Sequence, residues 1–174
     1  MSAPQESSPN ESRRFPNAHV VQFALRNFTI PVAAGTQALD LGCGSSVNAR
    51  FLMDCGFSVT EVPQAEVSGF QAPGKTYACA ISVGALDVAG MDQARKVVPR
   101  FMDALKPGGK ALLVFASADD SFAAESGRHG FTRREVESLI VLEFGASAWI
   151  DSCTTTYMND TRRQVDWLVT IAKR

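Results

Sequence analysis

The positions of apolar residues predict a chain in which strands and helices alternate. Short apolar runs bounded by glycine, proline or polar residues indicate strands at 37–41, 58–62, 77–83, 110–115, 148–158 and 165–172. Apolar residues at helical spacing indicate helices at 17–28, 46–54, 91–105 and from 133 onward.

The order of these elements predicts how the strands pair. A strand, a helix and a strand form a right-handed unit with parallel strands, and the most apolar strand, 110–115, is expected to be central. The last two strands are expected to form an antiparallel hairpin that turns at Asn159–Asp160 and packs Trp149, Tyr157 and Trp167 on the core. The pattern therefore predicts an α/β fold: a three-layer sandwich with a mostly parallel sheet and an antiparallel C-terminal hairpin.

Short signals indicate where elements begin and end. Ser46 and Gly56 are placed to cap the start and the end of the second helix. Pro99 predicts a kink or a restart in the third helix, and Lys-Pro-Gly-Gly at 106–109 predicts a turn before the central strand. Thr132 and Glu135 have the spacing of a capping box, with Phe131 and Val136 as its hydrophobic staple.

Length and composition predict one globular domain. The chain has 174 residues, of which residues 1–14 are rich in Ser, Pro and Glu and predict a disordered tail, leaving a single domain at 15–174. A net charge of −1 gives no basic excess for a nucleic-acid partner. No apolar run is long enough for a membrane span, and the N-terminus lacks a signal-peptide core.

The four cysteines, Cys43, Cys55, Cys79 and Cys153, show no CxxC spacing and no histidine cluster. This argues against a metal site and against a disulfide framework, and it favours a cytoplasmic protein.

A glycine turn follows the first strand, in the sequence Ala-Leu-Asp-Leu-Gly-Cys-Gly-Ser-Ser at 38–46. In an open α/β sheet a ligand binds at the carboxyl ends of the strands, and Gly42 and Gly44 allow the backbone to approach it. Asp40 is placed either to accept hydrogen bonds from a cationic amino group or to orient the turn. The nicotinamide fingerprint fails because Val47 stands where it has its third glycine.

This turn, read with the later "YACAISVGAL" and "FMDALKPGGKALLVFA", resembles the motifs of class I S-adenosylmethionine-dependent methyltransferases. The helix Asn-Ala-x-Phe-Leu resembles the small tellurite-resistance-like branch of that family. The resemblance spans residues 15–174 and implies a Rossmann-like methyltransferase fold, S-adenosylmethionine as cofactor and methyl transfer to a small-molecule acceptor, with no metal. The cofactor contacts that it implies are Asp40, Gly42, Cys43, Gly44, Ser45, Asn48, Glu61, Ser82 and Val83.

The sequence departs from this family's pattern after the second strand. The acid that normally holds the ribose hydroxyls is replaced by Pro63, with Glu61 or Glu66 as possible substitutes. Only 13 residues, 64–76, precede the third strand, which is too short for a helix and another strand. One edge of the sheet is therefore expected to be truncated and open to a protein partner or a second copy.

Two questions stay open at the level of sequence. His129, in a loop after the central strand, is either a general base or a solvated side chain. Asp119 and Asp120 either bind substrate or cap a turn. The alternative to an active methyltransferase is a non-catalytic protein of the same fold that binds the cofactor weakly or not at all.

Overall fold

In the part of the chain that the structure describes, six strands form one sheet, in the order β2-β1-β3-β4-β6-β5. The computed structural model describes residues 15–88, 90–140, 147–156 and 162–173. The strands are β1 (Gln37–Cys43), β2 (Ser58–Pro63), β3 (Tyr77–Val83), β4 (Leu105–Ala116), β5 (Ser147–Thr156) and β6 (Arg163–Ala172). Strands β2, β1, β3 and β4 are parallel, and β6 pairs antiparallel with both β4 and β5. The predicted mostly parallel sheet with an antiparallel C-terminal hairpin is confirmed.

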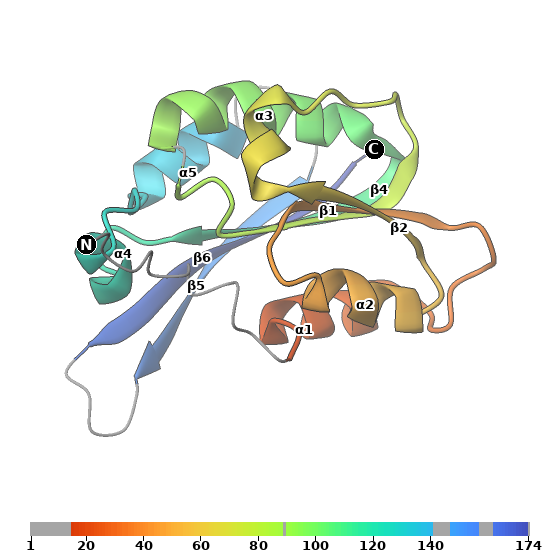
Figure 1. Ribbon diagram of the computed structural model, residues 1–174, viewed down its shortest axis with the longest axis horizontal. Helices are drawn as coiled ribbons and strands as arrows, with labels where there is room; N and C mark the ends of the chain where they lie inside the picture. Colours follow the sequence, from red (N-terminus) through yellow and green to blue (C-terminus); the bar gives the residue numbers. More distant parts are fainter. Residues whose placement is uncertain (1–14, 89, 141–146, 157–161, 174) are drawn as a thin grey trace, which may run out of the picture.

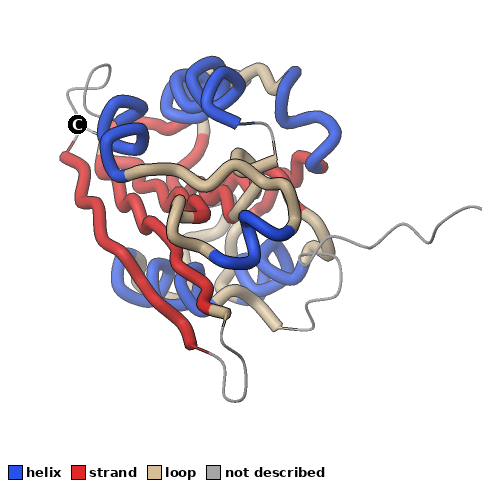
Figure 2. The backbone as a smooth tube through the Cα atoms, turned by 90° about the vertical axis from the view of Figure 1, so that its left-hand side faces the viewer, coloured by secondary structure: helices blue, strands red, loops and turns tan. Residues whose placement is uncertain are grey.

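Helices cover both faces of the sheet and make the three layers (Figures 1 and 2). They are α1 (Ala18–Asn27), α2 (Val47–Asp54), α3 (Gly90–Ala104), α4 (Ser121–Glu125) and α5 (Arg133–Ile140), with a 3-10 helix, η1, at Gln64–Gly69. Apolar side chains of α1 and α2 pack against one face of the sheet, and those of α3 and α5 pack against the other. Removal of this apolar surface from water is the main source of stability.

The expected truncation of one edge is also present. Strand β2 is the last strand on its side, and residues 64–76 hold only η1 and a loop. Because β1 lies between β2 and β3, this connection must cross over β1. It does so with Val67 and Phe70 buried in the same apolar cluster as Leu39 and Leu41.

Several expectations about element ends need correction. Residues 106–109 lie inside β4 as a bulge, because the pairing steps from Tyr77–Leu105 to Cys79–Lys110 and so gives β4 three extra residues. Helix α3 runs through Pro99 without a restart, so of the two alternatives only the kink stays a prediction.

Ser46 does occupy the N-cap position of α2, but with a φ of 57° and no capping hydrogen bond from its side chain. Gly56, with a φ of 97°, takes the left-handed conformation that was expected after α2.

The structure of the C-terminal hairpin confirms that Trp167 packs on the core and contradicts the same prediction for Trp149. The indole Nε1–H of Trp167 donates to the carbonyl of Phe131 at 2.7 Å, and the ring packs against the core. Trp149 is 59% exposed, because its neighbours Ala148 and Ile150 pack against the core and side chains alternate along the edge strand β5. Tyr157, the turn at 159–160 and the tail at 1–14 lie outside the described residues.

The capping box at the start of α5 is confirmed. The backbone N–H of Thr132 donates to Glu135 at 2.8 Å, and the N–H of Glu135 donates to the Thr132 hydroxyl at 3.3 Å. Phe131 and Val136 are both fully buried in one cluster. The hydrogen bonds from Thr132 lower the pKa of Glu135.

Replacement of Thr132 by Ala should lower the free energy of unfolding by about 1 kcal/mol, the usual cost of a lost N-cap side chain. The control is Thr132→Ser, which keeps the hydroxyl and should retain most of the stability. Urea unfolding followed by circular dichroism measures both variants. Equal stability of the Ala and Ser variants would contradict a role for this hydroxyl in α5.

Candidate functional site

The chain leaves the sheet at the carboxyl end of β1 through a tight turn. The pairing of β1 with β2 shifts between Leu41 and Cys43, and Gly42 has a φ of 82°, a conformation that favours glycine. Ser46 then begins α2 with a positive φ. The turn therefore lies at the strand ends, where open α/β sheets bind ligands.

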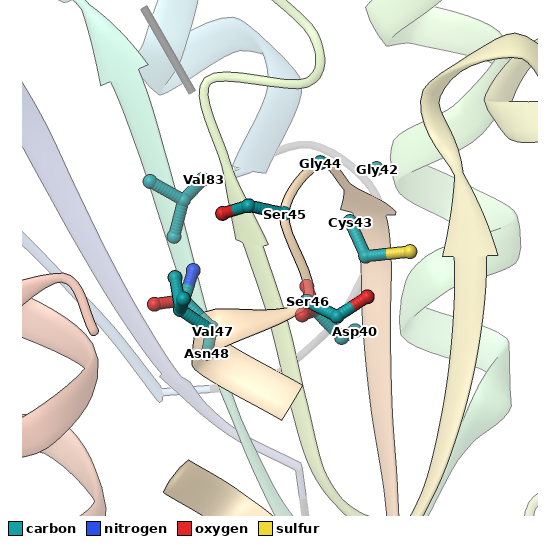
Figure 3. Close-up of a pocket in the computed structure, with 9 residues that line it drawn as sticks. All are labelled: Asp40, Gly42, Cys43, Gly44, Ser45, Ser46, Val47, Asn48 and Val83. Carbon is teal, nitrogen blue, oxygen red and sulfur yellow. The ribbon is translucent and has the colours of Figure 1, made fainter. Parts of the chain in front are cut away.

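A hollow opens at this turn (Figure 3). Its lining comes from the end of β1, the turn, the start of α2 and the end of β3: Asp40, Gly42, Cys43, Gly44, Ser45, Ser46, Val47, Asn48 and Val83. Of the cofactor contacts expected from sequence, only Glu61 and Ser82 are missing from this lining. The lining thus combines residues 40–48 with Val83, which is distant from them in the sequence.

Asp40 is the buried carboxyl group of the hollow. It is 3% exposed, and burial raises its pKa from 3.8 to about 7, with the nearby charge of Glu61 adding to the rise. The backbone N–H of Ala49 donates to Asp40 and opposes the shift. Asp40 therefore links β1 to the first turn of α2, and it does so as a group that titrates near neutral pH.

Glu61 reaches this region from β2. It pairs with Asp40 across the two parallel strands, and its carboxylate accepts a hydrogen bond from the Cys43 thiol. Burial, together with Asp40 and Glu61, raises the pKa of Cys43 to about 11. The thiol is therefore uncharged at neutral pH, which is the opposite of an activated nucleophile.

The side chains of Asn48 and Ser82 differ in their hydrogen bonding. The Asn48 Oδ1 accepts the backbone N–H of Asn17 at 2.8 Å, so this side chain attaches the start of α1 to α2. Ser82 is 2% exposed, and its hydroxyl has no hydrogen-bond partner among the described residues. A buried hydroxyl without a partner is costly, so Ser82 is a candidate for contact with a bound molecule.

The structure places His129 away from the hollow. Its backbone N–H donates to the carbonyl of Asp87 at 2.8 Å, and its ring packs edge-on against Phe131 at 4.5 Å between ring centroids. Its Nε2 lies 3.4 Å from Glu135. His129 thus belongs to the segment that leads into α5, and its role as a general base stays a prediction.

Two buried aspartates, in the segments that follow β3 and β4, attach these segments to neighbouring helices and strands. Asp120 accepts the N–H groups of Ala123 and Val165, the second at 2.7 Å, and so caps α4 as the capping alternative expected. Asp87 accepts the N–H of Ala116 at 3.1 Å, and burial raises its pKa to about 7. Both carboxyl groups hold backbone in place.

Sequence reasoning missed Gln64 and Ala85 at the edge of the site. The Gln64 amide donates to the Ala85 carbonyl at 2.8 Å, directly beside Gly42. Gln64 lies in no motif, although the short connection at 64–76 indicated that this region departs from the family's pattern. Ala85 belongs to the "YACAISVGAL" stretch, but nothing in that stretch indicated a contact with Gln64.

Among the described residues, no group of three or more His, Cys, Asp or Glu side chains is placed to hold a metal ion. Within the same residues, no helix is both long enough and apolar enough to cross a membrane.

Comparison with known proteins identifies the fold. No protein-family profile matches the sequence, and no curated protein matches it significantly. Among solved structures, phosphoethanolamine N-methyltransferase 2 from Haemonchus contortus, in complex with S-adenosyl-L-methionine, superposes on 89% of this chain with a TM-score of 0.69 and 12% identity. This chain spans only 52% of that protein's length.

Two shorter proteins give a similar result. A geranyl diphosphate methyltransferase in complex with SAM matches 88% of this chain and 84% of its own, with a TM-score of 0.61 and 12% identity. An S-adenosylmethionine-dependent methyltransferase from Methanosarcina mazei matches 82% and 94%, with a TM-score of 0.56 and 13% identity. The chain therefore has the Rossmann-like methyltransferase fold.

Replacement of Asp40 by Asn should make the protein more stable near pH 8 and change little near pH 4. The folded protein raises the pKa of Asp40 from 3.8 to about 7. The stabilising contribution of the neutral carboxyl is therefore complete below about pH 4 and is lost as the pH rises through 7. Asn is neutral at every pH and keeps an acceptor for Ala49. Between pH 4 and pH 8, the difference in free energy of unfolding between the Asp40→Asn variant and the wild type should grow by an amount on the order of a few kcal/mol.

Urea unfolding at a series of pH values measures this difference. The control is Asp54→Asn, at an exposed position of α2, for which no such divergence is expected. A constant difference between the Asp40→Asn variant and the wild type from pH 4 to 8 would contradict a neutral Asp40.

Proposed function

We propose that this protein binds S-adenosylmethionine at the turn after β1 and transfers its methyl group to a small-molecule acceptor. The observation that carries the proposal is the buried Asp40 beside a glycine turn, at the ligand-binding end of a methyltransferase-like sheet. Structures of the same fold that hold S-adenosyl-L-methionine support it.

The residues of the hollow fit the amino-acid end of this cofactor. Asp40 can accept hydrogen bonds from the ammonium group, and a charged donor beside it would favour its ionised form. The first turn of α2 lines the same hollow and favours a carboxylate. The Ser82 hydroxyl, which has no partner among the described residues, lies directly before Val83, which lines the hollow.

The cofactor supplies a methyl group on positively charged sulfur, which is already activated for transfer. The chain's own task is then to hold the acceptor in line and to exclude water, and no metal is needed. His129 is retained as the proposed base for acceptors that must lose a proton.

The nucleoside end fits less well. Pro63 offers no acceptor for the ribose hydroxyls, and Glu61 already accepts from the Cys43 thiol. These two observations favour the second candidate, a non-catalytic protein of the same fold with weak or absent cofactor binding. A binding measurement separates the two candidates.

We place the protein in the cytoplasm, in agreement with its free cysteines, and within the small tellurite-resistance-like branch, on the Asn-Ala-x-Phe-Leu motif at 48–52. We also propose that a second copy or a protein partner covers the open edge at β2, where Ser58 and Thr60 are exposed. Nucleic acid and membranes are not proposed as partners.

Replacement of Gly44 by Val should abolish cofactor binding while the fold survives. The branched side chain would stand in the hollow, where the ligand has to approach the backbone. Calorimetry with S-adenosylhomocysteine measures binding, and a thermal melt verifies folding. The control is Gly69→Val, since a Cβ added at Gly69 would meet no atom within 4 Å beyond its immediate neighbours in the chain. Unchanged affinity in a folded Gly44→Val protein would remove this turn from the site.

Cofactor affinity should rise with pH and level off above about pH 7. Below the raised pKa of Asp40 the ammonium group has to displace a proton from the carboxyl, so affinity falls by up to about tenfold for each pH unit. Asp40→Asn should remove this slope and weaken binding at pH 8 by about ten- to a hundredfold, the value of one charge-assisted hydrogen bond. Calorimetric titrations from pH 5.5 to 8.5 test both statements. A slope that persists in Asp40→Asn would assign the titration to another group.

A further inference from the structure

The hollow ends abruptly at Gly42. On one side of this residue lie the turn and α2, which line the hollow, and on the other side lie Gln64 and Ala85, which do not. A Cβ added at Gly42 would come within 2.1 Å of the Ala85 Cβ and 2.9 Å of the Gln64 Oε1. The backbone at the tip of β1 is therefore covered on this side by the start of η1 and by the segment after β3.

A hydrogen bond joins the start of η1 to the segment after β3. The Gln64 Nε2 donates to the carbonyl oxygen of Ala85 at 2.8 Å. Gln64 follows the end of β2 and Ala85 follows the end of β3, so this bond spans the tip of β1, which lies between those strands. We call the Gln64–Ala85 pair the clasp.

The short connection at 64–76 places Gln64 in the clasp. From Pro63 the chain turns directly into η1 and crosses β1, anchored by Val67 at 1% exposure and Phe70 at 8%. Gln64 is the first residue of η1, so its side chain starts beside the tip of β1. Ala85 is 1% exposed and provides a fixed acceptor. A longer connection would leave room to route the chain away from Gly42.

The clasp lies where an extended ligand would have to continue. Cys43, which lines the hollow, pairs with Pro63 across β1 and β2, and Gly42 forms the bulge between this pair and the pair Leu41–Val62. A ligand that extends from the hollow toward Pro63 therefore runs past Gly42. The hollow itself ends before this point. A ligand with an amino-acid end alone fits the open part, whereas a nucleoside attached to it needs the clasp to open.

We propose that Gln64 is a specificity-determining residue: its hydrogen bond to Ala85 closes the nucleoside side of the site, and adenosyl ligands bind only when this bond opens. The inference rests on the proposed function, because it assigns the ligand's amino-acid end to the hollow. Binding of an adenosyl ligand then selects the open state, and its apparent affinity is reduced by the fraction of molecules that are closed.

The test is the affinity of S-adenosylhomocysteine for the Gln64→Ala protein. Alanine cannot donate to Ala85, so the closed state loses one neutral hydrogen bond, which is worth about two- to tenfold in an equilibrium constant. We expect calorimetry to show binding about two- to tenfold tighter than in the wild type. Because a residue that only supports the site would weaken binding when it is removed, the sign of the change is diagnostic.

The matched control is Gln37→Ala. Gln37 lies at the opposite end of β1 and donates a comparable side-chain hydrogen bond to the carbonyl of Gly35 at 3.2 Å. This variant should bind like the wild type. Thermal melts of all three proteins verify that the folded state is populated at the temperature of the titration.

The possible results separate the two proposals. Tighter binding in Gln64→Ala alone supports the clasp. Equal or weaker binding in Gln64→Ala, with clear binding by the wild type, overturns the clasp and leaves the proposed function standing. Absence of binding in all three folded proteins overturns the proposed function, and the clasp with it.

Discussion

The position of β1 between two parallel strands is the constraint on which the rest of the structure depends. With β2 on one side and β3 on the other, the chain has to cross β1 between Pro63 and Tyr77. A crossover of this kind usually includes a full helix. Here 13 residues, positions 64–76, make it with one 3-10 helix and two buried apolar anchors, Val67 and Phe70.

This constraint shapes the site as well as the sheet. The sheet ends at β2 because the residues between β2 and β3 are too few to form another strand beside it. The first residue of this crossover, Gln64, lies at the tip of β1. On the other face, α2 follows β1 after a turn of three residues, 44–46, and donates an N–H from Ala49 to Asp40. The tip of β1 is thus enclosed from both sides, and enclosure is what raises the pKa of Asp40 to about 7. A carboxyl group in that condition responds to a cationic ligand by releasing a proton, which gives the hollow a chemical preference as well as a shape.

Much of this could be predicted from local sequence signals. Strand and helix order, the glycine turn and the capping box at Thr132–Glu135 each depend on a few neighbouring residues, and each is present in the structure. Counting residues between strands was enough to predict the truncated edge. Seven of the nine expected cofactor contacts meet at one hollow because they belong to two strand ends and one turn.

The failures have a common physical cause, since they depend on contacts between residues that are distant in the sequence. Trp149 is exposed because Ala148 and Ile150, and not Trp149, point to the packed face of β5, and the local pattern does not identify which face is packed. The bulge at 106–109 depends on the pairing of β4 with β3. Likewise, the contact of Gln64 with Ala85 exists only because the start of η1 and the segment after β3 meet over Gly42.

The central claim is that Asp40 is a buried carboxyl group with a raised pKa and that it binds the ammonium group of an adenosyl ligand. The most direct test is the pH titration of the Asp40 side-chain carbon by ¹³C NMR, with Asp40→Asn to assign the signal. The account predicts a midpoint near pH 7 in the free protein. It predicts a clearly lower midpoint when S-adenosylhomocysteine is present at saturating concentration. A midpoint near 4 in the free protein, or one that the ligand leaves unchanged, would contradict it.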